Sequence, residues 1–177
     1  ILVMSDNGAS QEGGPRGIVT AMGPYNAKPE PMAEKLARLD DIGGPNTHSN
    51  FPLGWAMASN TPLRRYKQNT HGGGIRDPLV IAWPARLPAR GEIRGQFAHA
   101  CDIVPTLLEL IGIDPPPTVA GIEQAPLEGE SFAASLTDPD APPRAGPQYF
   151  EMFGHRGLWR DGWKAVAYHP PGRPFDA

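Results

Sequence analysis

The chain has 177 residues, of which 16 are basic and 19 acidic, so its formal net charge at pH 7 is −3. This balance argues against a general binder of nucleic acids or anionic membranes, because both need a strongly basic surface. Hydrophobic residues make up 40% of the chain, which excludes wholesale disorder, and no apolar run approaches the ~18 residues of a membrane span. The 21 glycines and 22 prolines predict long ordered loops.

The chain opens with the apolar run Ile1-Leu2-Val3-Met4, followed by Ser-Asp-Asn-Gly. This pattern is typical of a buried parallel strand that ends in a loop at its carboxyl edge, where α/β sheets place their sites. Because the sequence starts abruptly inside such a strand, we expect a fragment of a longer protein.

The middle of the chain predicts two helices and a second strand. Residues 29–39 have apolar side chains at helical spacing, residues 40–65 read as a long ordered connection, and residues 77–84 form an apolar strand bracketed by prolines. The clearest helix spans residues 102–110, with Asp102 as its N-cap and Gly112 closing its C-terminus.

The last third predicts a short helix near residues 131–136, a strand over 148–153 and a hairpin of strands 158–160 and 163–168. Asp161-Gly162 is a turn dipeptide that favours positive φ. We therefore expect an α/β fold with an antiparallel hairpin near the C-terminus, divided into residues 1–147 and a second region, 148–177.

Two neighbouring oxygen ligands follow the first strand. The Asp6 carboxylate and the Asn7 amide are the kind of ligands that calcium and magnesium prefer, so they are candidate metal ligands. The purely structural alternative has even weight at this stage: Asp and Asn before a glycine also form Asx turns, in which their side chains bond to nearby backbone.

The segment Lys67-Gln-Asn-Thr-His71-Gly-Gly-Gly-Ile-Arg76 is a candidate oxyanion site. Three consecutive glycines leave backbone amides open to an anion, and Lys67, His71 and Arg76 add positive or proton-donating groups. Taken alone, this segment is better explained as a flexible glycine turn with a surface lysine and with Arg76 paired to Asp77.

Together the two segments resemble the sulfatase family, of the alkaline-phosphatase-like superfamily. VMSDNGAS is similar to its strand-end metal motif, and YKQNTHGGGIRDPLVIAWP to its lysine-bearing loop and following strand. Further segments agree in order, with the large bacterial arylsulfatases as the most similar members: GWAMASNTPLRRYK, DIVPTLLELIGI, LEGESFAASL and YFEMFGHRGLWRDGWKAV.

The resemblance implies a partial alkaline-phosphatase-like sheet and roles for four residues. Asp6 and Asn7 would be two ligands of a divalent cation, usually calcium. Lys67 would be catalytic and would contact the sulfate, with His71 as a weaker substrate-binding candidate. We expect the Asp6 and Asn7 oxygens to face the same side as the Lys67 ammonium. Gly72 departs from the family, which often has an acidic or amide residue there.

Sulfatases also use a formylglycine made from Cys or Ser in a Cys/Ser-x-Pro-x-Arg motif, and no such motif occurs here. Cys101 lies in a different context, and we expect it to be a small buried core residue. The resemblance therefore implies that the nucleophile lies outside this chain, and that this chain alone is inactive.

The expected function is that of a C-terminal part of an arylsulfatase-type hydrolase acting on small-molecule sulfate esters. Two alternatives stay open. A phosphoester or phosphonate hydrolase of the same superfamily would use the same metal pair and cationic loop. A non-catalytic anion-binding module would explain the absence of a nucleophile.

Overall fold

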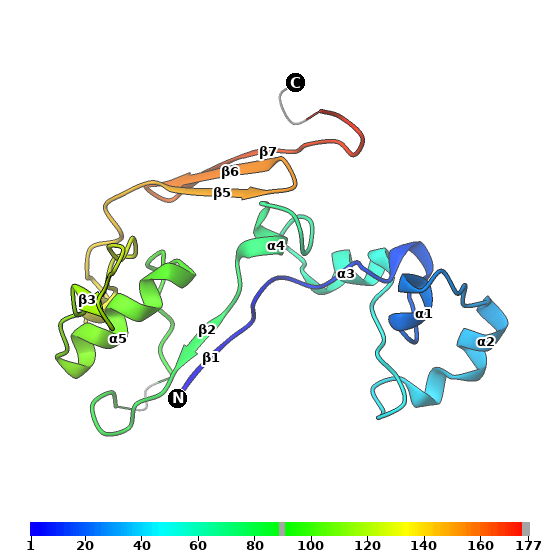
Figure 1. Cartoon of the computed structure of the whole chain (residues 1–177), viewed down its shortest axis with the longest axis horizontal. Helices are drawn as coiled ribbons and strands as arrows, with labels where there is room; N and C mark the ends of the chain where they lie inside the picture. The colour runs from blue at the N-terminus through cyan, green and yellow to red at the C-terminus, as the bar shows by residue number, and fades with distance from the viewer. Residues whose placement is uncertain (89–90, 175–177) are drawn as a thin grey trace. The chain divides into compact units, whose positions relative to one another are not determined.

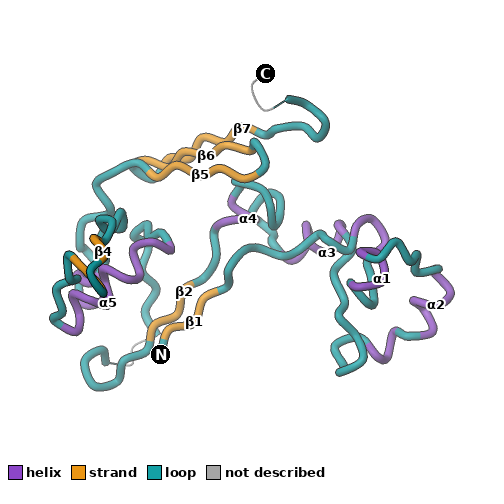
Figure 2. The backbone as a smooth tube through the Cα atoms, in the orientation of Figure 1, coloured by secondary structure: helices purple, strands orange, loops and turns teal. Residues whose placement is uncertain are grey.

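The computed structural model describes residues 1–88 and 91–174, and the described chain forms two compact units. Of the described residues, the α5 unit comprises 1, 81–88, 91–149 and 158–165, and the Lys67 unit comprises 2–80, 150–157 and 166–174. Much of the described chain runs as loop (Figure 2), as its glycine and proline content predicts. The predicted division at residue 148 stays a prediction.

The first strand, β1 (Leu2–Met4), pairs with β2 (Leu79–Ile81) in a two-stranded sheet (Figure 1). At its end, the Ile1 nitrogen donates to the Ala82 carbonyl at 2.8 Å and the Ala82 amide donates to the Ile1 carbonyl at 2.9 Å. This reciprocal pair is an antiparallel pattern. All three β1 residues are exposed, so the prediction of a buried parallel strand is wrong for the described chain.

Four short helices complete the Lys67 unit: α1 (Met22–Tyr25), α2 (Met32–Ala37), α3 (Leu53–Ser59) and α4 (Gly72–Ile75). The helix predicted over 29–39 is confirmed as α2 followed by a 3₁₀ turn, Leu39–Asp41. The connection predicted over 40–65 contains α3, which buries Ala56. Gly54 near its start weakens the helical signal in the sequence.

Two helices belong to the α5 unit: α5 (Ile103–Ile111) and α6 (Ala133–Thr137). Gly112 ends α5 in the left-handed region with φ 71°, as predicted. The Asp102 carboxylate does not cap α5; it accepts instead from the His99 amide at 2.7 Å and the Glu130 amide at 2.9 Å. The short strands β3 (Thr118–Val119) and β4 (Ile122–Glu123) form an antiparallel pair.

The three-stranded sheet near the C-terminus has the order β5–β6–β7. Its strands are β5 (Gln148–Met152), β6 (His155–Arg160) and β7 (Trp163–Ala167). Asp161 and Gly162 connect β6 to β7 with φ values of 50° and 82°. Positive φ at both positions is the geometry that an Asp-Gly hairpin turn requires, so the predicted hairpin is confirmed.

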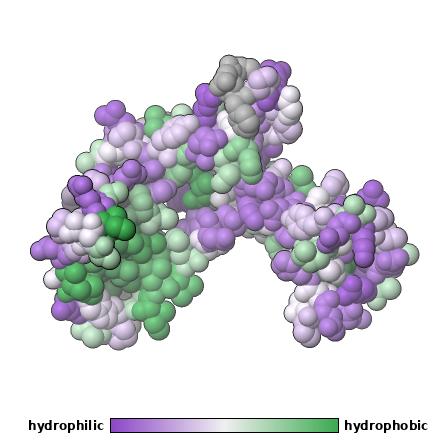
Figure 3. Space-filling view, viewed as in Figure 1, coloured by the Kyte–Doolittle hydropathy of each residue, from purple (hydrophilic) through white to green (hydrophobic). Residues whose placement is uncertain are grey.

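The buried hydrophobic core is small, and much apolar surface is exposed. The described core residues are Val19, Ala21, Ala56, Ala133 and Ala141. Figure 3 shows hydrophobic side chains gathered over α5, where Val104, Leu107 and Ile111 are about half exposed. Trp163 is 83% exposed, whereas Trp159 stacks on Phe97 with ring centroids 4.0 Å apart. Among the described helices, none is long and apolar enough to span a membrane.

Candidate functional site

The loop after β1 lies against the segment that carries Lys67. The Gly8 amide donates to the Gly74 carbonyl at 3.2 Å, and the Lys67 amide donates to the Ala9 carbonyl at 3.1 Å. Two segments about sixty residues apart in sequence are therefore joined through their main chains, next to Asp6 and Asn7 on one side and Lys67 on the other.

Glycines make this close approach possible. A Cβ atom on Gly8 would lie 1.7 Å from the Gly73 carbonyl oxygen, and one on Gly73 would lie 2.0 Å from the Arg65 carbonyl oxygen. No side chain fits at either distance. Gly8 and Gly73 therefore allow one main-chain segment to pack directly against another.

Asn60, at the C-terminal end of α3, hydrogen-bonds to both segments of the junction. Its side-chain oxygen accepts from the Ala9 amide at 3.2 Å, and its side-chain nitrogen donates to the carbonyls of Arg65 at 3.0 Å and Gly73 at 2.8 Å. One amide side chain thus bonds to the β1 loop and to two points of the lysine-bearing segment. The sequence offers no signal for this role.

The hydrogen bonds of the junction also bear on the Asx-turn explanation of Asp6 and Asn7. An Asx turn would use the Gly8 amide for Asp6 and the Ala9 amide for Asn7. Both amides bond elsewhere, to Gly74 and Asn60, so neither Asx turn forms. The Asn7 amide nitrogen donates to the Gly8 carbonyl at 3.1 Å, and its oxygen is the atom suited to a cation.

Asp77, just before β2, is affected by the charge of Asp6. Burial, and then repulsion from the Asp6 carboxylate, raises the pKa of Asp77. The charge of Asp6 therefore acts on Asp77, which sequence reasoning assigned only to an ion pair with Arg76. Among the described residues, no cluster of three or more His, Cys, Asp or Glu side chains is arranged to hold a metal ion.

Lys67 is half-buried and pairs with Glu12. Its ammonium lies 3.0 Å from the Glu12 Oε2 atom, and the other carboxylate oxygen accepts from the Gln68 side chain at 3.3 Å. Gln68 in turn accepts from the Gln11 side chain at 2.9 Å. The hydrogen bond and charge of Lys67 outweigh partial burial, so the pKa of Glu12 is lowered.

The glycine run does not form the expected open loop of amides. Gly72–Ile75 is the short helix α4, in which the Gly73 amide donates to Arg64 at 2.8 Å and the Gly74 amide to His71 at 2.9 Å. Both glycines are buried. The prediction that these amides approach an anion is therefore wrong, and Lys67 is the cationic group that the structure places at the junction.

His71 belongs to an aromatic cluster with the ends of β6 and β7. Tyr168 stacks on His155 at 4.7 Å, carries the Arg65 guanidinium 4.2 Å above its ring, and meets His71 edge-on at 6.5 Å. Burial, followed by the charges of His169 and Arg65, lowers the pKa of His155. This cluster packs on the lysine-bearing segment, and nothing in the sequence pattern indicated it.

Cys101 is exposed, so the expectation of a buried core thiol is wrong. Its sulfur lies 2.9 Å from the His99 Nδ1 atom. Burial of its surroundings nevertheless raises the pKa of the thiol, which is opposite to the activation of a nucleophilic cysteine. The buried residue is the neighbouring Asp102, which is 1% exposed. Its carboxylate forms an ion pair with the Arg144 guanidinium at 2.5 Å.

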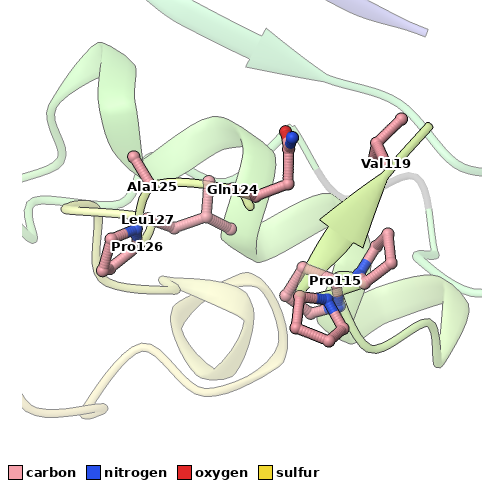
Figure 4. A pocket seen from close by; sticks show the side chains of 8 residues that line it. Pro115, Val119, Gln124, Ala125, Pro126 and Leu127 are labelled. Carbon is pink, nitrogen blue, oxygen red and sulfur yellow. The ribbon is translucent and has the colours of Figure 1, made fainter. Parts of the chain in front are cut away.

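A pocket of about 250 Å³ lies in the α5 unit beside β3 (Figure 4). It is lined by three consecutive prolines and by Val119, Gln124 and Leu127, among others. These walls carry no charged or nucleophilic group, so this pocket offers no chemistry for hydrolysis.

Comparison with known proteins gives consistent matches. Residues 1–113 match the family model described as Sulfatase. The chain is 28% identical over 135 residues to an arylsulfatase of Klebsiella aerogenes, covering 76% of this chain and 27% of that protein. It is 33% identical over 116 residues to an uncharacterized sulfatase of Schizosaccharomyces pombe, covering 66% and 20%. It is 40% identical over 58 residues to an N-acetylgalactosamine-6-sulfatase of Sus scrofa, covering 33% and 11%. The chain thus spans about a quarter or less of these relatives.

Proposed function

The chain belongs to the sulfatase family, and on that premise we propose that it forms part of a hydrolase of sulfate esters. The observation that carries the proposal is the junction between the β1 loop and the Lys67 segment. It joins a strand-end pair of oxygen ligands to a half-buried ammonium by the Gly8–Gly74 and Lys67–Ala9 hydrogen bonds. A sulfate group needs both a cation and hydrogen-bond donors.

The residues around Asp6 fit a divalent cation, calcium being the proposed one. The Gly8 and Ala9 amides bond elsewhere, which leaves the side-chain oxygens of Asp6 and Asn7 out of Asx turns. The repulsion that the Asp6 carboxylate exerts on Asp77 would be relieved by a positive ion beside them. Asp6 and Asn7 would hold the ion, which would polarise a sulfate oxygen. A calcium ion takes six to eight oxygens, so these residues supply part of its shell.

Lys67 is the proposed catalytic group of this chain. Its ammonium would contact a sulfate oxygen and offset negative charge as the ester bond breaks. His71 is proposed as a substrate-binding residue, held beside Tyr168. The nucleophile, proposed to be a formylglycine, would come from sequence outside this chain, and the sheet of the complete protein would be alkaline-phosphatase-like.

Calorimetric titration with calcium tests the metal proposal. We expect weak binding by this chain, and its loss in Asp6→Ala, because one carboxylate and one amide leave most of the shell to water. Asp140→Ala, in an exposed loop of the α5 unit, is the control. Equal binding by wild type and Asp6→Ala would contradict the assignment.

Hydrolysis by the longer protein that contains this segment tests the reaction. An aryl sulfate should be turned over, and Lys67→Ala should abolish turnover. The chain alone should give only background hydrolysis. Turnover of an aryl phosphate with no turnover of the sulfate would favour the phosphoester alternative instead.

A further inference from the structure

Glu12 is the feature of the site that the proposed chemistry does not use. Its carboxylate is 26% exposed at the side chain and lies 3.0 Å from the Lys67 ammonium. A sulfatase lysine serves by its positive charge, and here a fixed carboxylate already faces that charge.

The Glu12 carboxylate is held in place from three sides. Its Oε2 atom accepts from the Ser10 hydroxyl at 3.1 Å as well as from Lys67, and its Oε1 atom accepts from Gln68. The Ser10 hydroxyl also accepts from the Glu12 amide at 3.2 Å. These contacts fix the carboxylate beside Lys67 instead of leaving it on a freely rotating side chain.

The backbone holds the two partners in register. The Lys67 amide bonds to Ala9, three residues before Glu12, and the Gln11 and Gln68 side chains bond to each other. Residues 9–12 and 67–68 are therefore connected by hydrogen bonds of both main chain and side chains. The ion pair is a built part of the junction.

We propose that Glu12 is a built-in counter-anion that weakens the hold of Lys67 on inorganic sulfate more than on a sulfate ester. An ammonium has three N–H donors, so Glu12 can keep one while a sulfate oxygen takes another. The carboxylate then repels the bound anion in proportion to its charge. Inorganic sulfate carries two negative charges and a sulfate ester one, so the product of hydrolysis is repelled about twice as strongly as the substrate.

This role rests on the proposed function of Lys67, and it makes Glu12 a specificity-determining residue that favours release of product. It predicts that neutralising Glu12 strengthens sulfate binding. A residue that merely positioned Lys67 would give the opposite result, because its loss would weaken binding.

The experiment treats the whole chain with an amine-specific acylating reagent and measures the rate at Lys67 by mass spectrometry of its peptides after digestion, with exposed Lys28 as internal reference. Without sulfate, Glu12→Gln should raise the relative rate at Lys67 about twofold to fivefold, as expected for loss of a partly exposed ion pair. Glu34→Gln, the same charge change at an exposed site in α2, should leave the rate unchanged.

The second arm adds sodium sulfate against sodium chloride at matched ionic strength. Sulfate should protect Lys67 at an about threefold to tenfold lower concentration in Glu12→Gln than in wild type. An equal or higher concentration in Glu12→Gln overturns the counter-anion role, as does an unchanged rate at Lys67 in the first arm. Methyl sulfate should show a smaller gain than inorganic sulfate, and an equal gain overturns the charge argument.

Two further results keep the test decisive. If Glu12→Gln does not fold, Glu12→Ala takes its place in both arms, with the same expected and refuting results. If sulfate protects Lys67 in neither protein while Glu12→Gln still raises the rate, the sulfate-binding role of Lys67 is wrong and the counter-anion effect falls with it, but the ion pair stands.

Discussion

Replacing Gly8 by alanine tests whether the junction depends on close contact between main chains. The added Cβ atom would lie 1.7 Å from the Gly73 carbonyl oxygen, whereas real Cβ contacts are essentially never shorter than 3.0 Å. The obstacle is backbone, so the two segments must separate by about 1.3 Å, the difference between these distances.

That separation breaks specific bonds. The Gly8–Gly74 hydrogen bond at 3.2 Å and the Lys67–Ala9 bond at 3.1 Å cannot survive it, and each contributes about 1 kcal/mol net. Together with the steric cost of overpacking, of order 1–3 kcal/mol, we expect Gly8→Ala to lower the free energy of unfolding by about 3–5 kcal/mol.

The assay is urea denaturation of the chain followed by circular dichroism, with Gly54→Ala as the matched control. Gly54 lies within α3, and a Cβ atom added there would meet nothing within 4 Å, so alanine at this position should stabilise the protein by about 0.5–1 kcal/mol. A Gly8→Ala protein within about 0.5 kcal/mol of wild type, which is the spread of ordinary surface substitutions, would refute the reasoning.

Three other outcomes follow from the described contacts. Asn60→Ala should lower the free energy of unfolding by about 2–3 kcal/mol, because three hydrogen bonds are lost. The control Asn46→Ala, at an exposed position and measured in the same urea series, should be neutral. Equal free energies of unfolding for the two variants would contradict the role of Asn60 at the junction. Although burial raises the pKa of Asp102, hydrogen bonds from two backbone amides and Arg144 lower it overall. Wild type should therefore lose stability as the pH falls below about 4, and Asp102→Asn should lose less over that range; parallel curves of Tm against pH would disprove this. Burial lowers the pKa of Lys164 to about 8 from 10.5, so the unfolded chain binds more protons between these values and Tm should rise with pH there, a rise that Lys164→Met should remove; a flat wild-type curve would count against it.

Local chemistry accounts for the parts of the fold that the sequence could predict. Asp161-Gly162 requires positive φ in a two-residue hairpin whatever surrounds it, and Gly112 ends α5 for a similar local reason. The oxygen ligands Asp6 and Asn7 can be identified as candidates in the same way, because residue type and position after a strand suffice.

The features that the sequence does not predict depend on distant partners. The pairing of Glu12 with Lys67 follows from the path of the fifty-odd residues between them, which no local pattern encodes. The three glycines suggest open amides, but their absent side chains serve contact with residues 8 and 65. Asp102 has the pattern of a cap for α5, and its burial beside Arg144 depends on a partner more than forty residues further along the chain.

The main-chain junction also bears on how this protein can change over generations. Residues 13–59 leave the junction after Glu12 and return to it at Asn60, whereas the hydrogen bonds that define the junction join residues 8–12 to residues 60–74. Lineages can therefore lengthen, shorten or exchange residues 13–59 while the positions of Asp6 and Asn7 relative to Lys67 stay the same. Additions would enter most easily near Gly43, which is exposed, has φ +87° and has open space around it, and a lengthened excursion there could present new surface to substrates of a different shape.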